Sequence, residues 1–199
     1  MEIAALITKM KDNILLIPEG RFDTLTRDKG YADSFIYLLV TVLMTIPFYI
    51  AMQFLGPVIG IASGESAVAA GFGLVISIAT VIGVRLLSVV FSYIGFGIMH
   101  ILLKLVGGKA DFLKTVQVMI YGSTPSLLLS WIPCIGWIFG LIGLINIILG
   151  AKRVHGISLL RAIVAMLVIP ILIAGVVAVL IVLFFGFTLA GITQLVPSA

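Results

Sequence analysis

Long apolar runs alternate with short charged segments along the chain. The first run, residues 34–55, is long enough for roughly 33 Å of helix, which is sufficient to cross a bilayer. Further runs cover residues 69–105, 112–131, 137–150 and 158–187. They are continuous and do not alternate every second residue, which favours helices over the strands of a membrane barrel. We therefore predict an all-α fold, a polytopic transmembrane helical bundle of about five spans.

A shorter stretch before the first span has a different pattern. Over residues 3–17, apolar side chains recur at helical spacing with charged and polar ones between them. We expect an amphipathic helix that ends at Pro18, followed by a charged connector. Its lysines could meet anionic headgroups, or the helix could dock on the end of the bundle. The predicted domains are 1–33 for this helix and connector, 34–187 for the transmembrane domain, and 188–199 for a short extracytoplasmic tail.

The second apolar run is too long for one span perpendicular to the membrane. Residues 69–105 would form roughly 55 Å of helix, against roughly 30 Å of hydrocarbon. One solution is a single long element in which residues 69–84 re-enter the membrane, lie at its interface or tilt strongly. The alternative divides the run at Arg85 into two spans. We expect the single element, because the division would place the later basic loops outside the cell.

Three prolines are expected to bend the spans, and short uncharged segments are expected to join them. Pro47, Pro125 and Pro170 lie inside predicted spans, where a missing N–H bends a helix. Residues 56–68 and the turn at 131–136 contain no lysine or arginine. We expect both to be loops on the outer side.

Composition supports a membrane protein. Hydrophobic residues make up 62% of the chain and charged residues 10%, whereas soluble domains have roughly 45–50% and about 25%. A compact soluble fold of this size could not hide so much apolar surface, so we expect the surplus to face lipid.

The charge distribution predicts the orientation. The net charge is +4, but the lysines and arginines form short clusters between the apolar runs, which is typical of membrane orientation and not of nucleic-acid binding. With the N-terminus in the cytoplasm, eleven of the twelve basic residues lie at cytoplasmic positions. Five spans then place the C-terminus on the far side.

Arg85 is the strongest candidate for function. It is the only charge well inside a predicted apolar segment, and a charge buried in the membrane costs several kcal/mol. It could reach the outer headgroups, or it could face a buried partner or a cavity. Glu65 is the only acidic residue on that side that could pair with it.

The remaining polar candidates favour packing over chemistry. His100 lies near the inner boundary, and Asn146 can form a hydrogen bond between helices. Glycines at 136, 140, 143 and 150 predict a face for close helix packing, within the chain, with a partner membrane protein or with a second copy. Two histidines and Cys134 do not make a metal site. We expect no catalytic residues, no metal and no cofactor.

The segment from Gly107 onward resembles the core of the Yip (Ypt-interacting protein) membrane family. The matching features are the Gly107, Gly108 and Lys109 turn, the pair Tyr121 and Pro125, Pro133 and Gly136 in the outer turn, and Lys152 to Gly156, which includes Arg153 and His155. Residues 16–22, Leu-Ile-Pro-Glu-Gly-Arg-Phe, are similar to the family's prokaryotic members. The resemblance covers about the last 95 residues and this short segment.

The resemblance implies five transmembrane helices, a cytoplasmic N-terminus and a C-terminus on the far side of a membrane, here a prokaryotic cell membrane. In eukaryotic relatives it implies binding to Rab-type GTPases during vesicle traffic. The family's Asp-Leu-Tyr-Gly-Pro motif is absent here and only about 33 residues precede the first span, so we do not expect a GTPase partner. The leading hypothesis is a non-enzymatic membrane protein that organises the bilayer or partner proteins. The alternative is a small transporter or channel with a pathway near Arg85.

Overall fold

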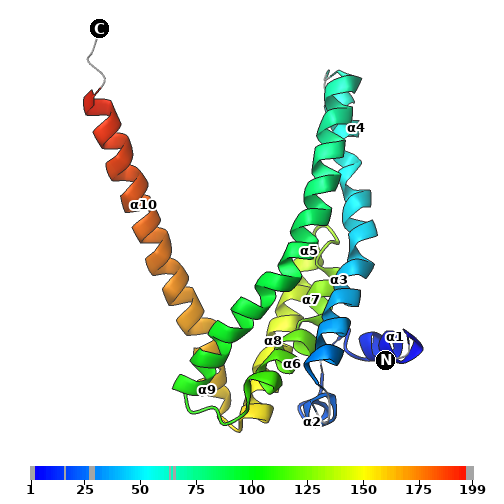
Figure 1. Cartoon of the computed structure of the whole chain (residues 1–199), viewed down its shortest axis with the longest axis vertical. Helices are drawn as coiled ribbons and strands as arrows, with labels where there is room; N and C mark the ends of the chain where they lie inside the picture. The colour runs from blue at the N-terminus through cyan, green and yellow to red at the C-terminus, as the bar shows by residue number, and fades with distance from the viewer. Residues whose placement is uncertain (1–2, 16, 27–29, 63, 65, 196–199) are drawn as a thin grey trace.

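The chain folds into helices joined by short loops (Figure 1). The computed structural model describes residues 3–15, 17–26, 30–62, 64 and 66–195, and within this part of the chain no strand is present. Its elements are α1 (Ile3–Asp12), α2 (Arg21–Leu25), α3 (Tyr31–Gln53), α4 (Leu55–Ala62), α5 (Ala67–Leu105), α6 (Phe112–Gly122), α7 (Thr124–Leu129), α8 (Gly136–His155), α9 (Leu159–Ile163), the π-helical turn η1 (Val164–Val168) and α10 (Ile169–Leu195). The predicted all-α fold is confirmed.

Within the described residues, four helical segments are long and apolar enough to cross a membrane. They are Tyr31–Ile59, Ala67–Leu105, Gly136–His155 and Leu159–Phe184. The remaining predicted span, residues 112–131, is the third along the chain and is divided between α6 and α7 at Ser123. Pro125 explains the break, because it has no N–H to donate to the carbonyl four residues earlier and its ring would clash there. The number of five spans is therefore approximate.

The packed core lies where α3, α5, α6, α7 and α8 meet. α8 packs against α6 and α7, and α3 packs against α5 and α7. Tyr37 and Leu38 of α3 and Val116, Ile120 and Tyr121 of α6 are almost completely buried between them. Basic side chains gather at one end of these helices, which we call the basic end and which is defined by Lys104, Lys109, Lys114, Lys152, Arg153 and Arg161.

α5 is one unbroken helix of 39 residues. It neither turns at Arg85 nor re-enters over residues 69–84, so the prediction of a single long element is confirmed. Residues 55–62, most of which were expected to belong to a loop, form α4. Pro57 is tolerated there because it lies in the first turn, where its missing N–H has no helical partner. α4 and the first half of α5 pack together and extend well beyond the loop between α7 and α8 (Figure 1).

The last apolar run leaves the bundle. α9 and η1 pack against the bundle, and α10 then extends away from α5 so that the two helices diverge from the basic end (Figure 1). At η1 the N–H of Ile169 donates to the carbonyl of Val164, five residues earlier, which accommodates Pro170 in the next position. α10 continues to Leu195, past the expected end of the span at residue 187. All side chains of residues 171–184 are exposed.

Three of the four glycines predicted to form a packing face contact other parts of this chain. An added Cβ would lie 2.4 Å from the Ser130 carbonyl oxygen at Gly136, 3.1 Å from Ser126 Oγ at Gly143 and 2.7 Å from Phe22 Cε1 at Gly150. Only open space surrounds the corresponding position at Gly140. The close approach is thus made within the chain, against α7 and the N-terminal segment.

Gly122, at the end of α6, is the position where we expect a single methyl group to destabilise the bundle. A Cβ there would lie 2.9 Å from Ile147 Cγ1 and 3.0 Å from the Ile147 backbone nitrogen on α8. Gly122→Ala should lower the free energy of unfolding by about 1–3 kcal/mol, because α8 must move away. The matched control, Gly140→Ala, should be neutral or slightly stabilising. Thermal unfolding of the detergent-solubilised protein, followed by circular dichroism, would contradict this packing if both variants melted alike.

Candidate functional site

The N-terminal segment is bound to α8 near the basic end. The buried side chain of Asn146 accepts a hydrogen bond from the backbone N–H of Ile17 and donates one to the carbonyl of Leu15, both 2.8 Å long. One side chain therefore satisfies two backbone groups that lie outside any helix. We call residues 9–15 and 17–26, which lie against the bundle, the N-terminal clasp.

Two ion pairs continue the clasp along the last turn of α8. Lys152 Nζ lies 2.8 Å from Glu19 Oε1, and Arg153 Nη2 lies 2.6 Å from Asp23 Oδ2. Arg153 also donates from Nε to both carboxylate oxygens of Asp23 at 3.1 Å. Because all four side chains are partly exposed, the pairs contribute little to stability and mainly fix the register of the clasp on α8.

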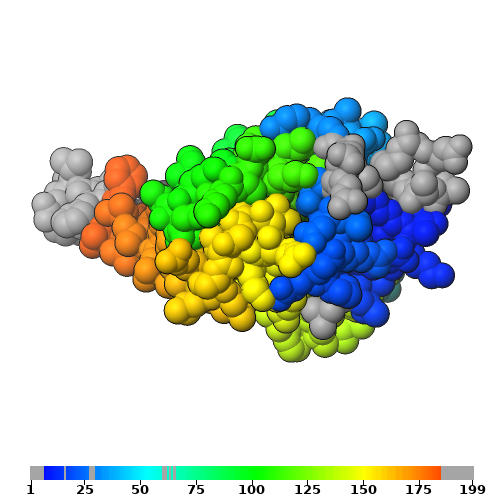
Figure 2. Space-filling view, turned by 90° about the horizontal axis from the view of Figure 1, so that it is seen from below, coloured from blue at the N-terminus to red at the C-terminus, as the bar shows by residue number. Residues whose placement is uncertain are grey.

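Phe22 anchors the clasp. Its side chain is completely buried and its ring lies directly over Gly150, where any larger residue would overlap it. Burial of one such ring stabilises a fold by about 1.5–3 kcal/mol. Seen from the basic end, the N-terminal residues in blue lie directly against α8 in yellow (Figure 2). The clasp is therefore held by apolar packing and by hydrogen bonds, with ion pairs at its edge.

Lys9 reaches into the bundle from α1. Its ammonium lies 3.6 Å from the ring centroid of Tyr121 and 5.3 Å from that of Tyr37. The two rings meet edge to face at 4.9 Å, and the Tyr37 hydroxyl lies 2.9 Å from Thr124 Oγ1. A lysine over two tyrosine faces is a cation–π arrangement, worth roughly 0.5–2 kcal/mol according to its exposure. Tyr121 is one of the residues that the sequence singled out. It lies on α6, in the surface on which the N-terminal segment docks.

The amphipathic helix docks on the bundle. Met10 of α1 is buried against it, as are Asn13 and Ile17 of the segment that follows, whereas Ile7 and Leu15 are 50% and 60% exposed. The helix predicted over residues 3–17 is too long, because α1 ends at Asp12 and the backbone at Leu15 and Ile17 is bound by Asn146 instead. The helix was expected either to meet lipid headgroups or to dock on the end of the bundle. The buried residues show that its inner side docks. The exposed apolar residues are on its outer side, and α1 lies across the direction of the long helices (Figure 1).

His100 and His155 are linked through Thr115. Thr115 Oγ1 lies 2.7 Å from His100 Nδ1 and 3.0 Å from His155 Nε2. A hydroxyl has one proton, so it donates to one ring and accepts from the other, which fixes the relation between the two tautomers. His155 is buried, and the Cα of Gly108 packs so closely on its ring that a Cβ would lie 2.7 Å from Nδ1. The Lys109 N–H donates to the His155 carbonyl, which holds the loop against α8.

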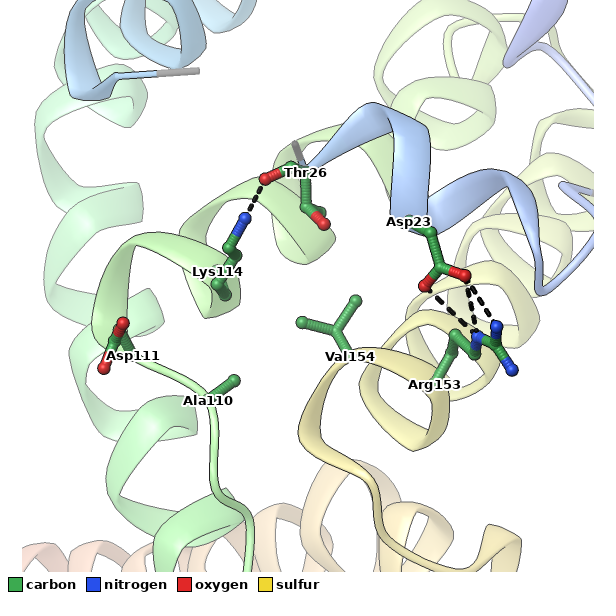
Figure 3. A pocket seen from close by; sticks show the side chains of 7 residues that line it. All are labelled: Asp23, Thr26, Ala110, Asp111, Lys114, Arg153 and Val154. Atoms are coloured by element: carbon green, nitrogen blue, oxygen red, sulfur yellow. Dashed lines mark hydrogen bonds and ion pairs between the residues drawn. The ribbon is translucent and has the colours of Figure 1, made fainter. Parts of the chain in front are cut away.

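A groove of about 410 Å³ opens beside the clasp (Figure 3). It is lined by Asp23, Thr26, Ala110, Asp111, Lys114, Arg153 and Val154. Lys114 donates to the carbonyl of Thr26, and Arg153 pairs with Asp23 (Figure 3). Both cations of the groove thus already have acceptors from the clasp, and these contacts hold the clasp in place.

Arg85 lies far from this cluster, on α5. Its guanidinium carbon is 3.6 Å from the ring centroid of Tyr49 on α3, and its side chain is half-buried. Glu65, the predicted acidic partner, lies outside the described residues. Because α5 is unbroken, roughly 27 Å of helix separates Arg85 from Ala67 at its start. The structure does not bring Arg85 together with His100 or the other candidates.

Several residues of the clasp, and Tyr37 of α3 against which it packs, could not be singled out from the pattern alone. Phe22, Lys9 and Tyr37 have ordinary surroundings in the sequence, and their partners lie about 30 to more than 100 residues away. One signal was available: Glu19 and Asp23 are spaced by four, as are residues on one face of a helix. Within the described residues, no three His, Cys, Asp or Glu side chains converge to hold a metal ion.

The long apolar helices, with a charged N-terminal segment bound across one end, define a polytopic helical membrane protein. The chain matches the Yip1 domain family over residues 13–193 and belongs to that family. The predicted membership is thereby confirmed, and the matched region includes the clasp from residue 13 onward. The family is not known for enzymatic activity. No curated protein and no solved structure matches the chain.

Asn146 is the residue on which the clasp most depends. Asn146→Leu keeps the side-chain volume but leaves the Ile17 N–H and the Leu15 carbonyl without their partner. We expect protection of the Ile17 amide against hydrogen exchange to fall about tenfold, since a hydrogen bond of this kind is worth roughly 1 kcal/mol or more. Gln53→Leu removes an amide outside the clasp and should leave the protection of the Ile17 amide unchanged. Equal protection of Ile17 in the wild type and in Asn146→Leu would show that other contacts hold the segment.

Proposed function

We propose that this chain is a non-enzymatic membrane protein that organises partner proteins or the bilayer around it. The observation that carries this proposal is the apolar hairpin of α4 and the first half of α5, which extends beyond the packed bundle. Its large side chains are freely exposed, including Val58 at 65%, Val68 at 70% and Phe72 at 69%. α10 exposes a similar surface over residues 171–184.

α5 is longer than the hydrocarbon core of a bilayer is thick. α5 measures roughly 58 Å at 1.5 Å per residue, against roughly 30 Å of hydrocarbon. A helix with this mismatch tilts, thickens the bilayer locally or associates with other helices. Local thickening and association gather lipid or protein around the chain, as expected of an organising protein.

We infer that the basic end faces the cytoplasm. Three of the six basic residues that define it, Lys114, Lys152 and Arg153, contact the N-terminal clasp. Positive charge near membrane-spanning segments is retained on the cytoplasmic side. The N-terminus is then cytoplasmic, and an odd number of spans places the C-terminus on the far side. The similarity of residues 16–22 to prokaryotic relatives supports a prokaryotic cell membrane as the location.

Transport is the weaker proposal. The side chains around Arg85 come from α3 and α5 alone, and they form a groove on the side of the helix pair, not an enclosed pathway. A transporter with a site at the midplane would surround its substrate with several helices. The GTPase binding of eukaryotic relatives is not part of the proposal.

Photo-cross-linking tests the organising role. A photoreactive residue at Val179 on α10 or at Phe72 on α5 should capture defined protein partners in the native membrane several times more strongly than one at Ile145. Ile145 is the matched control, because its 44% exposed side chain lies on the packed bundle. Lipid adducts alone at all three positions, together with solute flux in proteoliposomes that is lost in Arg85→Ala, would replace the organising role by transport.

A further inference from the structure

Within the part of the chain that the structure describes, Arg85 is a cation without a counter-ion, in a region of few charges. Between residues 34 and 103 the sequence contains only one other charge, Glu65. Among the described residues, the guanidinium contacts the ring of Tyr49 and forms no hydrogen bond or ion pair. A cation–π contact offsets only part of what the guanidinium loses when it leaves water. The site therefore requires an anion that the described chain does not supply.

The height of Arg85 in the membrane follows from its neighbours. Tyr49 lies under the guanidinium, and its hydroxyl is 3.0 Å from Ser130 Oγ, at the end of α7. The adjacent Phe48 stacks on Trp131 at 4.7 Å. The loop of residues 130–135 is irregular and largely exposed, and an exposed irregular backbone does not occur inside hydrocarbon. Arg85 thus lies at the level of lipid headgroups at the loop end of the bundle, opposite the basic end.

The surface beside Arg85 has the shape and polarity for an amphiphilic anion. A groove of about 310 Å³ between α3 and α5 is lined by Tyr49, Thr80, Val81, Val84 and Arg85. Its walls are almost entirely apolar. From this groove toward the basic end, α5 presents a row of exposed apolar side chains: Leu87, Val90, Phe91, Ile94 and Ile98. An acyl chain can lie along this row.

We propose that Arg85 and Tyr49 form a binding site for the phosphate group of a phospholipid. The guanidinium pairs with the phosphodiester oxygens, where its planar donors suit two acceptors at once. Tyr49 holds the guanidinium in place through its ring. The acyl chains then lie along α5 toward the middle of the membrane. This site is independent of the proposed organising role and would exist in a protein of any function.

The test measures lipid binding to the full-length protein in detergent. Native mass spectrometry and thermal unfolding are followed on addition of phosphatidylglycerol, phosphatidylcholine, diacylglycerol or inorganic phosphate. Both phospholipids should bind and raise the melting temperature, because both carry a phosphodiester and acyl chains. Diacylglycerol, which lacks the phosphate, and inorganic phosphate, which lacks the chains, should do neither. In Arg85→Gln, phospholipid binding should weaken about tenfold.

Two further variants separate the site from general effects. Arg161→Gln removes an exposed cation at the basic end. This variant should bind phospholipid as strongly as the wild type does. Val81→Glu places a carboxylate four residues before Arg85, where it can pair with the guanidinium within α5. This variant should fold without added lipid and lose the phospholipid-dependent rise in melting temperature.

Three results would overturn the proposal. Equal phospholipid binding by the wild type and Arg85→Gln would remove Arg85 from the site. An equal rise in melting temperature with inorganic phosphate would indicate a site for free anions. An equal rise with diacylglycerol would indicate an apolar groove that does not recognise phosphate.

Discussion

Hydrocarbon offers no partner to a backbone N–H or carbonyl, and this constraint governs where the chain can depart from a helix. Each departure is satisfied by the protein or lies where water or headgroups can reach it. Asn146 supplies both hydrogen bonds for the non-helical backbone at Leu15 and Ile17. The break between α6 and α7 is short, and the Ser123 N–H still donates to the Met119 carbonyl. The exposed loops 106–111 and 130–135 lie at opposite ends of the α6–α8 hairpin, which is where two polar interfaces would meet it.

The same constraint made much of the fold predictable. Apolar runs of sufficient length can only be helices, so the helical class and the unbroken α5 followed from run length and charge position. α4 was missed because Gly56, Pro57 and Gly60 suggest a loop in water, whereas in an apolar environment a helix satisfies the same backbone. The division of residues 112–131 depends on Pro125, which the pattern indicated as a bend. Whether it bends or breaks a helix is decided by neighbouring packing, which composition does not reveal.

The candidate residues were less predictable, because their roles depend on contacts between distant segments. Asn146 was expected to bond across helices, and it does bond across segments, but to the backbone of the N-terminal residues. Gly150 was expected to let another helix backbone approach closely, but it accommodates the side-chain ring of Phe22 on α2. The glycine at position 108 of the turn is explained by His155, because the buried ring of His155 leaves no room for a Cβ there. The N-terminal segment and the last turn of α8 therefore form one structural unit.

The account rests on the two loops being on opposite sides of a membrane, and the chain contains a natural probe for this. Cys134 is its single cysteine and is exposed in the loop between α7 and α8. A membrane-impermeant maleimide added to intact cells should label Cys134. In a Cys134→Ser background, Lys109→Cys in the opposite loop should react only after the cells are permeabilised. Labelling of both positions from the outside, or of position 109 alone, would contradict the orientation and the crossing of the membrane between the two loops.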